Sequence, residues 1–426
     1  MQRESSPGTE ESITTPPGYR QSEIGSLPDE WEITTLGALG RPLSGGTPRT
    51  SEPCYWNGEI PWISSKDMKV SRLNDSIDHV TPLALGNGTR LVQPGTILMV
   101  VRGMSLVHSF PVAIVEKPVT FNQDLKAFVP NADVDGEFVL RWLEFNQVTL
   151  LLLATEATHG TKRIPTPDLL ASQVPLPPPE EQHAIAEALS DVDGLLGALE
   201  ALIAKKRAIK QAAMQQLLTG RNRLPGFDDA WETKRLDNLG FFSKGYGIKR
   251  DEVSQDGFPC IRYGEIYTTY ETRVSDPLTL IPLDVALSAL PINAGDILFA
   301  GSGETAEEIG RCTVYLGEDQ AYAGGDIVVL TPVRQNSLYL GYLLNHATVA
   351  AQKARMAQGD AVVHISAANL AQVQVSLPPI GEQGAIADVL SDMDDEIATL
   401  ERRHDKTRAL KQGMMEQLLT GRVRLV

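Results

Sequence analysis

The stretch Leu176-Pro-Pro-Pro-Glu-Glu-Gln-His-Ala-Ile-Ala-Glu-Ala-Leu-Ser-Asp-Val-Asp193 returns later in the chain as Leu377-Pro-Pro-Ile-Gly-Glu-Gln-Gly-Ala-Ile-Ala-Asp-Val-Leu-Ser-Asp-Met-Asp394. A second stretch, Lys210-Gln-Ala-Ala-Met-Gln-Gln-Leu-Leu-Thr-Gly-Arg221, returns as Lys411-Gln-Gly-Met-Met-Glu-Gln-Leu-Leu-Thr-Gly-Arg422. Both pairs keep one offset of 201 residues (176 to 377 and 210 to 411). Chance similarity does not hold one register over such a length, so the chain contains an internal duplication.

Each copy has the pattern of one long helix. Pro177-Pro-Pro179 is followed by Glu180 and Glu181, and proline with carboxylates at a first turn is a helix-start signal. Thr219-Gly220 supplies a glycine stop. Apolar residues between these ends recur in a heptad-like spacing, which predicts that the two helices pack on one another as an antiparallel coiled coil. The predicted seam consists of Ile185, Leu189, Val192, Leu196, Leu199 and Ile203 in the first copy, and of Ile386, Leu390, Met393, Ile397 and Leu400 in the second.

Two features of these helices have alternative interpretations. The helices pack on one another in the favoured interpretation, and the alternative is that each packs only on the globular segment beside it. Basic residues gather in the late half of each helix, as at Lys206, Lys210 and Lys411, and we expect them to form a solvated face, with phosphate contact as the alternative. His404, at the seam position of Ile203, is expected to be a polar register position rather than a metal ligand.

The segments between the two copies are similar in length and have diverged almost completely. Leu27-Pro-Asp-Glu-Trp31 at the start of the first segment matches Leu224-Pro-Gly-Phe-Asp-Asp-Ala-Trp231 at the start of the second. In both segments, short apolar runs separated by Gly, Pro and Asn turns then precede one amphipathic helix. This order predicts an α+β protein with two mixed α/β domains, two long helices and a pseudo-two-fold internal repeat. The predicted parts are a disordered tail (1–26), a first domain (27–170), a first helical spacer (171–221), a second domain (222–370) and a second spacer (371–426).

Composition excludes several classes of protein. The longest mostly apolar run, 148–154, is far too short to span a bilayer, and residues 1–26 lack the apolar core of a signal peptide. Three scattered cysteines without a C-x-x-C pair favour a cytoplasmic setting and no metal site. The formal net charge of −16 argues against a generic polyanion binder, but it does not exclude a sequence reader whose basic residues are grouped on one surface.

The sequence lacks the motifs of nucleotide hydrolysis and of amino-methylation. No Gly-Lys-Ser/Thr phosphate loop occurs, and no Asn/Asp-Pro-Pro-Tyr/Phe stretch of an amino-methyltransferase. Glu232-Thr-Lys234 offers part of the acidic-plus-lysine set of a metal-dependent nuclease, but the matching Glu32-Ile-Thr34 of the first copy has no lysine. We therefore expect a non-catalytic chain without catalytic or metal-binding residues.

The layout resembles the specificity subunit of type I restriction-modification enzymes, in which two target-recognition domains alternate with two conserved helical regions. The resemblance covers about 27–426. Besides both helix copies, it is carried by Leu27-Pro-Asp-Glu-Trp31, Ser44-Gly-Gly-Thr-Pro48, Ile60-Pro-Trp-Ile-Ser64, and Asn122-Gln123 with Lys126. In the second domain the counterpart of Asn122-Gln123 is Gly324-Gly325.

The resemblance implies a non-catalytic subunit that binds double-stranded DNA at a bipartite, asymmetric target, with the paired helices as a ruler between two readers. It also implies a complex with methylation subunits, which bind S-adenosylmethionine, and with a restriction subunit, which uses ATP and Mg²⁺. Cofactors would then belong to the partners and not to this chain. The rival hypotheses are a stand-alone nuclease or methyltransferase with fused recognition domains, and a protein-binding scaffold, which the acidic balance would suit.

Candidate DNA-binding residues are polar and basic side chains in the loops of the two variable domains. Recognition of DNA needs such groups on base edges and on phosphates. The candidates are Thr47, Arg49, Lys66, Arg102, Lys126, Lys162 and Arg163 in the first domain, and Lys244, Tyr246, Lys249, Arg250, Arg262, Arg311 and His364 in the second.

Overall fold

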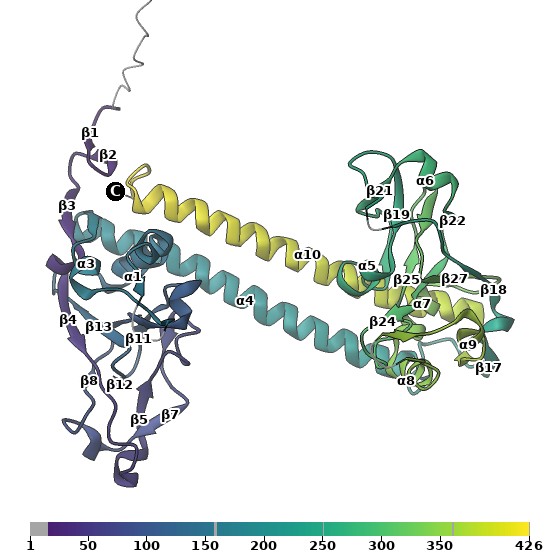
Figure 1. The fold of residues 1–426 in the computed structure, drawn as a ribbon, viewed down its shortest axis with the longest axis horizontal. Helices are drawn as coiled ribbons and strands as arrows, with labels where there is room; N and C mark the ends of the chain where they lie inside the picture. The colour runs from purple at the N-terminus through teal and green to yellow at the C-terminus, as the bar shows by residue number, and fades with distance from the viewer. Residues whose placement is uncertain (1–15, 157–159, 250, 360–361, 426) are drawn as a thin grey trace, which may run out of the picture. The chain divides into compact units, whose positions relative to one another are not determined.

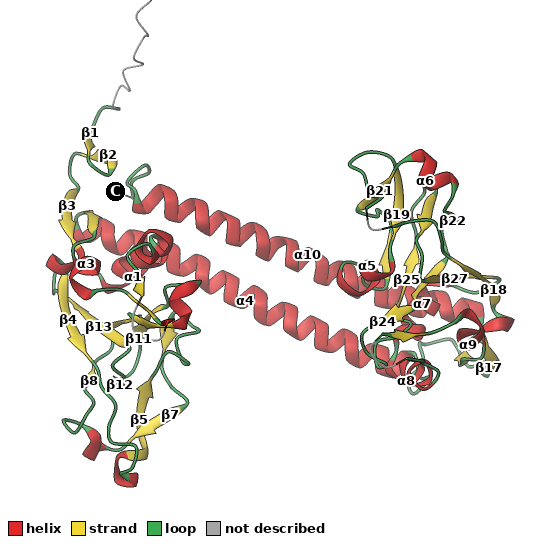
Figure 2. Ribbon diagram, in the orientation of Figure 1, coloured by secondary structure: helices red, strands yellow, loops and turns green. Residues whose placement is uncertain are grey.

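The computed structural model describes residues 16–156, 160–249, 251–359 and 362–425 (Figure 1). These residues form two compact units. One comprises the described residues up to 199 together with 403–425, and the other comprises those from 200 to 402. Each unit holds one mixed α/β domain, the first half of one long helix and the second half of the other, with the helices and strands distributed as in Figure 2.

The first domain is built on two mixed sheets. The larger has the strand order β4 (Gly40–Ser44), β13 (Leu125–Pro130), β9 (Ile97–Val100), β11 (Val112–Val115), β6 (Arg72–Leu73). The smaller has the order β7 (Asp78–Val80), β5 (Trp56–Ile63), β12 (Val119–Phe121), β8 (Leu91–Val92). Shorter pairings join β10 (Arg102–Gly103), β15 (Lys162–Arg163) and β14 (Thr155–Glu156), β16 (Gln173–Leu176) with β3 (Glu32–Thr35), and β1 (Tyr19–Ser22) with β2 (Gly25–Pro28).

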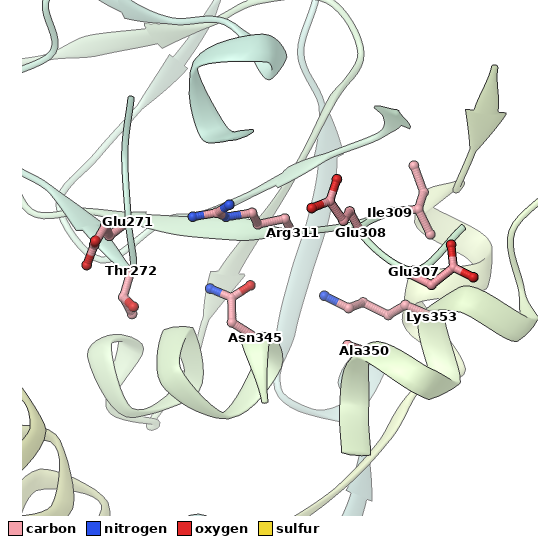
Figure 3. Close-up of a pocket in the computed structure, with 9 residues that line it drawn as sticks. All are labelled: Glu271, Thr272, Glu307, Glu308, Ile309, Arg311, Asn345, Ala350 and Lys353. Carbon is pink, nitrogen blue, oxygen red and sulfur yellow. The ribbon is translucent and has the colours of Figure 1, made fainter. Parts of the chain in front are cut away.

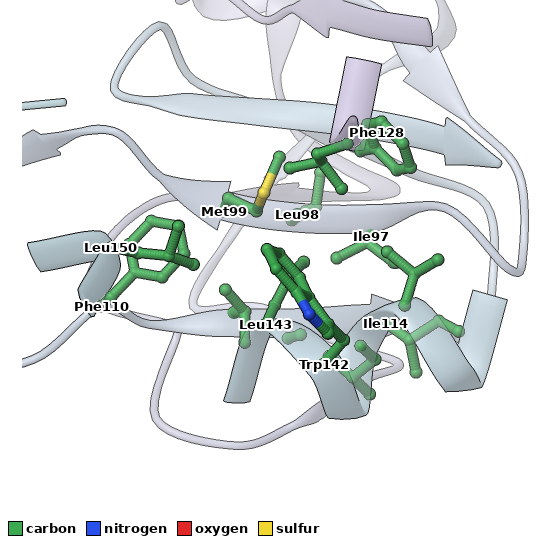
Figure 4. Close-up of a cluster of buried hydrophobic side chains, with 14 of the residues drawn as sticks. Ile97, Leu98, Met99, Phe110, Ile114, Phe128, Trp142, Leu143 and Leu150 are labelled. Atoms are coloured by element: carbon green, nitrogen blue, oxygen red, sulfur yellow. The ribbon is translucent and has the colours of Figure 1, made fainter. Parts of the chain in front are cut away.

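The core of the first domain lies between the larger sheet and helix α1 (Gly136–Phe145), which packs on β11. Every residue of β9 and of β11 is buried, so both strands are continuous apolar runs rather than alternating ones. Figure 4 shows Trp142 and Leu143 of α1 among the buried side chains that fill the space between this helix and the sheet, with Ile97 and Ile114 in the same cluster. Helices α2 (Gln147–Leu151) and α3 (Thr166–Leu170) complete the domain before α4 (Pro179–Leu217) begins.

The second domain repeats the strand order of both main sheets. Its larger sheet has the order β18 (Gly240–Lys244), β27 (Ile327–Pro332), β23 (Ile297–Ala300), β25 (Cys312–Tyr315), β20 (Arg273–Val274). Its smaller sheet has the order β21 (Thr279–Ile281), β19 (Phe258–Ile261), β26 (Ala321–Ala323), β22 (Leu290–Ile292). The other elements are β24 (Ser302–Gly303) paired with β28 (Val363–His364), β17 (Glu232–Arg235) paired with β29 (Gln374–Leu377), and helices α5 (Tyr263–Thr268), α6 (Leu283–Leu287), α7 (Ser337–Asn345), α8 (Ala347–Arg355), α9 (Ala367–Ala371) and α10 (Ile380–Leu419).

The long helices α4 and α10 run antiparallel where they meet. In the first unit Lys411 of α10 lies 2.7 Å from Asp193 of α4. In the second unit Lys210 of α4 pairs with Asp394 of α10, which is the same contact displaced by one repeat. Antiparallel packing places the basic late half of each helix beside the acidic early half of the other. The expectation that this basic cluster is only a solvated face is therefore wrong for Lys206, Lys210 and Lys411, because each pairs with a carboxylate of the other helix.

A second repeated contact closes each unit. Glu181, at the start of α4, accepts a hydrogen bond from the Trp31 indole at 2.9 Å and from the Nε of Arg424, beyond the end of α10, at 2.7 Å. Glu382, at the start of α10, accepts from Arg223, beyond the end of α4, at 2.8 Å. Both carboxylates are buried. The arginines follow Gly220 and Gly421, whose positive φ values reverse the chain after each helix.

The seam residues do not all share one environment. Ile185 and Leu189 belong to the core of the first domain, and Ile386 and Leu390 belong to the core of the second. Leu199, Ile203 and Ile397 are buried, and Val192, Leu196, Met393 and Leu400 are half-buried. Packing on the neighbouring domain, which the sequence offered as the alternative, therefore applies to the first turns of each helix, while the ion pairs between helices occur further along.

Residues 16–26 differ from the sequence expectation of a disordered tail. Strands β1 and β2 form an antiparallel hairpin over 19–28, and the Arg20 guanidinium donates hydrogen bonds to the backbone carbonyls of Pro28, Asp29 and Trp31. The remainder of the expected tail, 1–15, lies outside the described residues. Among the described residues, no helix has both the length and the apolar character that a bilayer crossing needs.

Candidate nucleic-acid interface

One edge of the first domain gathers the loops that carry its polar and basic residues. Strands β5 and β12 are parallel and end side by side, where Asn122 N donates to Ile63 O at 2.9 Å. The loop after β4 joins them, because Gly46 N donates to Phe121 O at 2.9 Å. The start of β10 joins as well, since Arg102 N donates to Asp124 O at 3.1 Å. Loops from four separate parts of the sequence thus meet at one set of strand ends.

Glycines make this close approach possible. A Cβ on Gly45 would lie 2.4 Å from Asn122 O, and a Cβ on Gly46 would lie 2.1 Å from Gly88 O. Only a residue without a side chain fits there, which is the physical reason for the Gly-Gly of the Ser44–Pro48 motif. The same loop lines a cavity of about 410 Å³ that also contains Arg90.

The predicted residues of the first domain lie on this edge or on adjoining strands and loops, and not all of them are loop residues, because Lys126 is on β13 and Arg102, Lys162 and Arg163 are on β10 and β15. The Thr47 hydroxyl donates to Gln123 Oε1 at 2.6 Å, and Lys126 Nζ donates to Ser44 Oγ at 2.5 Å. Arg102 is directly opposite Arg163 in the β10–β15 pairing. Lys162 is held by Glu156 at 3.0 Å, whereas Arg49, Lys66, Arg102 and Arg163 are exposed.

Gln123 is a candidate that the list of predicted residues missed. Asn122 is buried and turns the chain, because its side-chain oxygen accepts from Asp124 N at 3.0 Å. Gln123 is exposed and presents its amide beside Thr47. The signal was present in the Asn-Gln dipeptide after a strand, since amide side chains are suited to hydrogen bonding with base edges.

The second domain forms the same edge from the equivalent strands. Gly324 N donates to Ile261 O at 2.9 Å, as Asn122 N does to Ile63 O. Gly301 N donates to Asp326 O at 2.7 Å, as Val101 N donates to Asp124 O at 2.9 Å in the first domain. The frame of backbone hydrogen bonds is retained, although Asn122-Gln123 is replaced by Gly324-Gly325.

The side chains on the second edge are different. Lys244, at the end of β18, and Tyr246 and Lys249, on the loop after it, are exposed, and Arg250 lies outside the described residues. His364 pairs with Ser302 in the β24–β28 pairing as Arg163 pairs with Arg102 in the first domain. The Nδ1 of His364 lies 2.8 Å from Ser302 Oγ. Arg262 follows β19 directly and lines a cavity of about 510 Å³ together with Lys249 and Gly325.

Arg311 belongs to a separate cavity. This cavity, of about 420 Å³, places Arg311 and Lys353 among the carboxylates of Glu271, Glu307 and Glu308 (Figure 3). Burial lowers the pKa of Lys353, whose Nζ donates to Gly310 O. The acidic lining opposes a polyanion, so among the predicted residues of this domain Arg311 has the setting least suited to a phosphate contact.

A tyrosine helps to hold the second edge in place. The Tyr267 hydroxyl of α5 donates to Ser302 O of β24 at 3.1 Å. Burial raises the pKa of Tyr267 to about 12, so the phenol stays protonated and remains a donor across the physiological range.

The residues that the sequence offered for catalysis or metal binding make contacts within the fold. Lys234 lies on β17 within the β17–β29 pairing and contacts Glu232 at 2.7 Å. Within the described part of the chain, no three His, Cys, Asp or Glu side chains are grouped as metal ligands would be. His404 is buried, with its Nδ1 3.4 Å from Asp405. The strand-end edges of the two domains present amides, hydroxyls and guanidinium groups that form hydrogen bonds, and lysines that carry positive charge.

The two domains share one fold but present different hydrogen-bonding side chains from the same strand-end loops. This arrangement is typical of a protein with two distinct recognition domains. The family model of the type I restriction modification DNA specificity domain matches the chain twice, at 28–211 and at 228–407. The chain therefore belongs to this family. It is a type I restriction-modification specificity subunit, which determines DNA target recognition and is a non-catalytic component of its enzyme.

Individual relatives agree with this assignment. The chain is 30% identical over 195 residues to the type I restriction enzyme EcoR124I/EcoR124II specificity subunit of Escherichia coli, a match that spans 45% of this chain and 48% of that relative. It is 21% identical over 420 residues to the type I restriction enzyme MjaVIII specificity subunit of Methanocaldococcus jannaschii, spanning 94% of both chains. The fold is similar to that of the type I restriction-modification S subunit from M. genitalium, with a TM-score of 0.60, 16% identity, and coverage of 91% of this chain and 96% of that one.

Proposed function

We propose that this subunit reads a bipartite, asymmetric target in double-stranded DNA, one half with each domain. The observation that carries the proposal is the contrast between the two strand-end edges. Their backbone hydrogen bonds are equivalent, but one presents Thr47 with Gln123 and the other presents Arg262 beside a glycine pair. A frame that repeats while its exposed polar groups differ suits two readers of different base sequences.

The proposed contacts follow the exposure of each predicted residue. In the first domain we propose that Thr47, Gln123, Arg102 and Arg163 meet bases or phosphates. The other contacts that we propose are Arg49, Lys66, Lys126 and Lys162 in the first domain, and Lys244, Tyr246, Lys249, Arg262 and His364 in the second. We propose no DNA contact for Arg311 because its cavity is acidic.

The proposed assembly contains further subunits. Target choice by this chain would direct methylation by methylation subunits that bind S-adenosylmethionine, and restriction by a restriction subunit that uses ATP and Mg²⁺. We propose that the complex works in the cytoplasm, where chromosomal and invading DNA are both accessible. The role of the paired helices in setting the separation of the half-sites stays a prediction.

Exchange of one domain tests the two-reader proposal. Residues 224–370 are replaced by the equivalent segment of a related subunit, and methylated sites are mapped by sequencing host DNA with the original and the exchanged gene. We expect one half of the target to change and the other half to persist. A change in both halves together, or in neither, would refute separate reading.

The nuclease alternative has its own test. Lys234→Ala removes the lysine of the acidic-plus-lysine set. We expect the assembled complex to cleave DNA as before, because Lys234 lies on β17 and forms an ion pair with Glu232 of the same strand. The purified chain alone should neither cleave nor methylate DNA. Loss of cleavage with DNA binding intact in Lys234→Ala would revive the nuclease hypothesis.

A further inference from the structure

The residue after β5 in the first domain and the residue after β19 in the second make the same hydrogen bond, from the backbone N–H to a nearby carboxylate. In the first domain Ser64 N donates to Asp67 Oδ2 at 2.8 Å. In the second, Arg262 N donates to Glu265 Oε2 at 2.9 Å. A carboxylate three residues ahead thus caps the turn in each case, and this cap is part of the common frame.

The second domain adds a contact that the first does not have. Glu265 Oε1 accepts from Arg262 Nε at 3.0 Å and from Arg262 Nη2 at 2.8 Å, and it also accepts from the Thr279 hydroxyl. Glu265 is only 8% exposed, so its carboxylate is held by its surroundings. Charge-assisted bonds from two nitrogens to one buried carboxylate fix the plane of the guanidinium. The first domain has only the Ser64 hydroxyl at this position, bonded to the same Asp67 oxygen at 2.9 Å.

These bonds leave one edge of the guanidinium available. They use the edge formed by Nε and Nη2, and no acceptor among the described residues bonds to Nη1 of Arg262. The side chain is 33% exposed and lines the cavity of about 510 Å³. Gly325 also lines this cavity, and a Cβ added to it would meet no atom within 4 Å. The free edge carries two parallel N–H donors, one on Nη1 and one on Nη2.

We propose that Arg262 reads a guanine in the half-site of the second domain, with Glu265 as its positioning residue. The proposal rests on the proposed function and names one determinant of that specificity. A guanidinium that offers two parallel donors matches the O6 and N7 acceptors of guanine in the major groove, the commonest specific arginine contact. Because Glu265 holds the guanidinium before DNA arrives, little side-chain entropy is lost on binding.

A purely structural role for the pair predicts different results. If Arg262 and Glu265 only stabilise the turn into α5, their replacement should lower stability and leave base choice unchanged. The first domain supplies the variants that separate the two roles. Glu265→Asp restores the shorter carboxylate of Asp67, which caps the backbone but does not reach as far toward the guanidinium. The double variant Arg262→Ser with Glu265→Asp reproduces the Ser64 and Asp67 cap in full.

The experiment measures base preference position by position. The subunit, assembled with its methylation and restriction partners, selects bound duplexes from a DNA library randomised over both half-sites, without ATP. The variants compared are Arg262→Ala, Glu265→Asp and the Arg262→Ser, Glu265→Asp double variant, each with its thermal unfolding recorded. Arg235→Ala is the matched control, because Arg235 pairs with Asp237 at 2.6 Å on the unrelated β17 segment.

We expect Arg262→Ala and the double variant to lose the preference for guanine at one position of one half-site by about 5- to 150-fold, the range of one bidentate contact. Glu265→Asp should relax the same position by a smaller factor, and the other half-site should persist in every variant. The double variant should unfold at the temperature of the original chain, and Arg235→Ala should select the original target.

Three outcomes would overturn the inference. They are an unchanged guanine preference in the double variant, relaxation of both half-sites together, and an original target without a guanine in the affected half. In the first and the third outcome the original complex still selects a bipartite sequence, so the proposed function stands. Relaxation of both half-sites together would also contradict separate reading by the two domains, and with it the proposed function. An original complex that selects no sequence at all would instead remove the proposed function, and this inference with it.

Discussion

The two halves of this subunit differ in the side chains exposed at the strand ends and agree in the contacts that join the two long helices. Asp193 with Lys411 and Asp394 with Lys210 are one contact made twice, and so are the contacts of Glu181 and Glu382 with an arginine beyond the other helix. The loops at the strand ends share backbone bonds but not side chains. Buried ionic partners must change together to remain paired, whereas an exposed loop residue can change alone, so the helix contacts are retained while the loop side chains differ.

The cap after β5 and β19 shows this division within a few residues. Asp67 and Glu265 both accept the backbone N–H of the residue three positions before them. The residue that they cap is a serine in one domain and an arginine in the other. The backbone bond serves the fold, while the side chain beside it is free to serve recognition.

The largest expected effect comes from a charge placed in the helix pair. Leu199 is 4% exposed and Leu195, one turn earlier on α4, is 40% exposed. Leu199→Asp should lower the free energy of unfolding by about 3–4 kcal/mol, because it buries an unpaired carboxylate. Leu196→Asp, at a half-buried position, should cost less. Denaturant unfolding of the purified subunit measures each loss, with Leu195→Asp as the control, and equal losses for Leu195→Asp and Leu199→Asp would contradict the assigned seam.

The next effect tests whether the repeated contact at the helix starts is equivalent in the two halves. Glu181→Ala leaves the buried Trp31 indole N–H and the Arg424 guanidinium without their carboxylate, and it should cost about 2 kcal/mol. Glu382→Ala should lower stability by a similar amount, because it removes the same partners from Trp231 and Arg223. Glu30→Ala is the control, since Glu30 contacts Arg424 from an exposed position. Strongly unequal losses would break the equivalence.

A smaller effect compares Arg163 with its register counterpart His364. Arg163→Ala should alter recognition by the first domain only, and His364→Ala by the second only. A base contact would relax one position by about 1–3 kcal/mol, whereas a phosphate contact would weaken all sequences equally and flatten the salt dependence. Lys162→Ala should act less than Arg163→Ala, because Glu156 already engages Lys162. Binding titrations at several salt concentrations distinguish the two contacts, and an effect of Arg163→Ala on the second half-site would contradict separate reading.

The smallest expected effect is a loss of folding stability at acid pH that arises only in the second domain. His346 begins α8, where the first domain has Asn146 at the start of α2, and burial lowers the pKa of His346 below its ordinary value of 6.5. Its Nδ1 lies 3.4 Å from Thr348 N as the acceptor at the helix start, and a proton there would remove this acceptor and meet the positive end of the helix dipole.

Because the unfolded chain takes up that proton more readily than the folded one, His346 should destabilise the fold as the pH falls below about 6.5 and have no such effect above it. His346→Asn should remove this part of the pH dependence. Unfolding of the original and variant chains at pH 8 and at pH 5 measures the difference. A variant as acid-sensitive as the original chain would show that another group titrates.

Local patterns in the sequence were sufficient for the architecture. The duplication, the order of strands and helices, and two long helices that pack together all follow from periodicity, capping residues and glycine stops, and the structure confirms this fold class. These signals depend on residues a few positions apart, because hydrogen bonds within a helix and alternation within a strand are local. The same locality explains why the hairpin over 19–28 was missed: Arg20 stabilises it through carbonyls that no periodic pattern reveals.

The partners of individual side chains were decided only by the tertiary structure. Thr47 meets Gln123 across 76 residues of sequence, and Lys210 meets Asp394 across 184. A pattern of basic residues along one helix cannot tell solvent from a carboxylate on another helix, and a composition of loop residues cannot tell which loops share an edge. The sequence by itself therefore determined that this protein is a repeated frame with two variable domains. Which side chains the frame brings together depended on strand pairing and antiparallel helix packing, because these join residues that have no local relation along the chain.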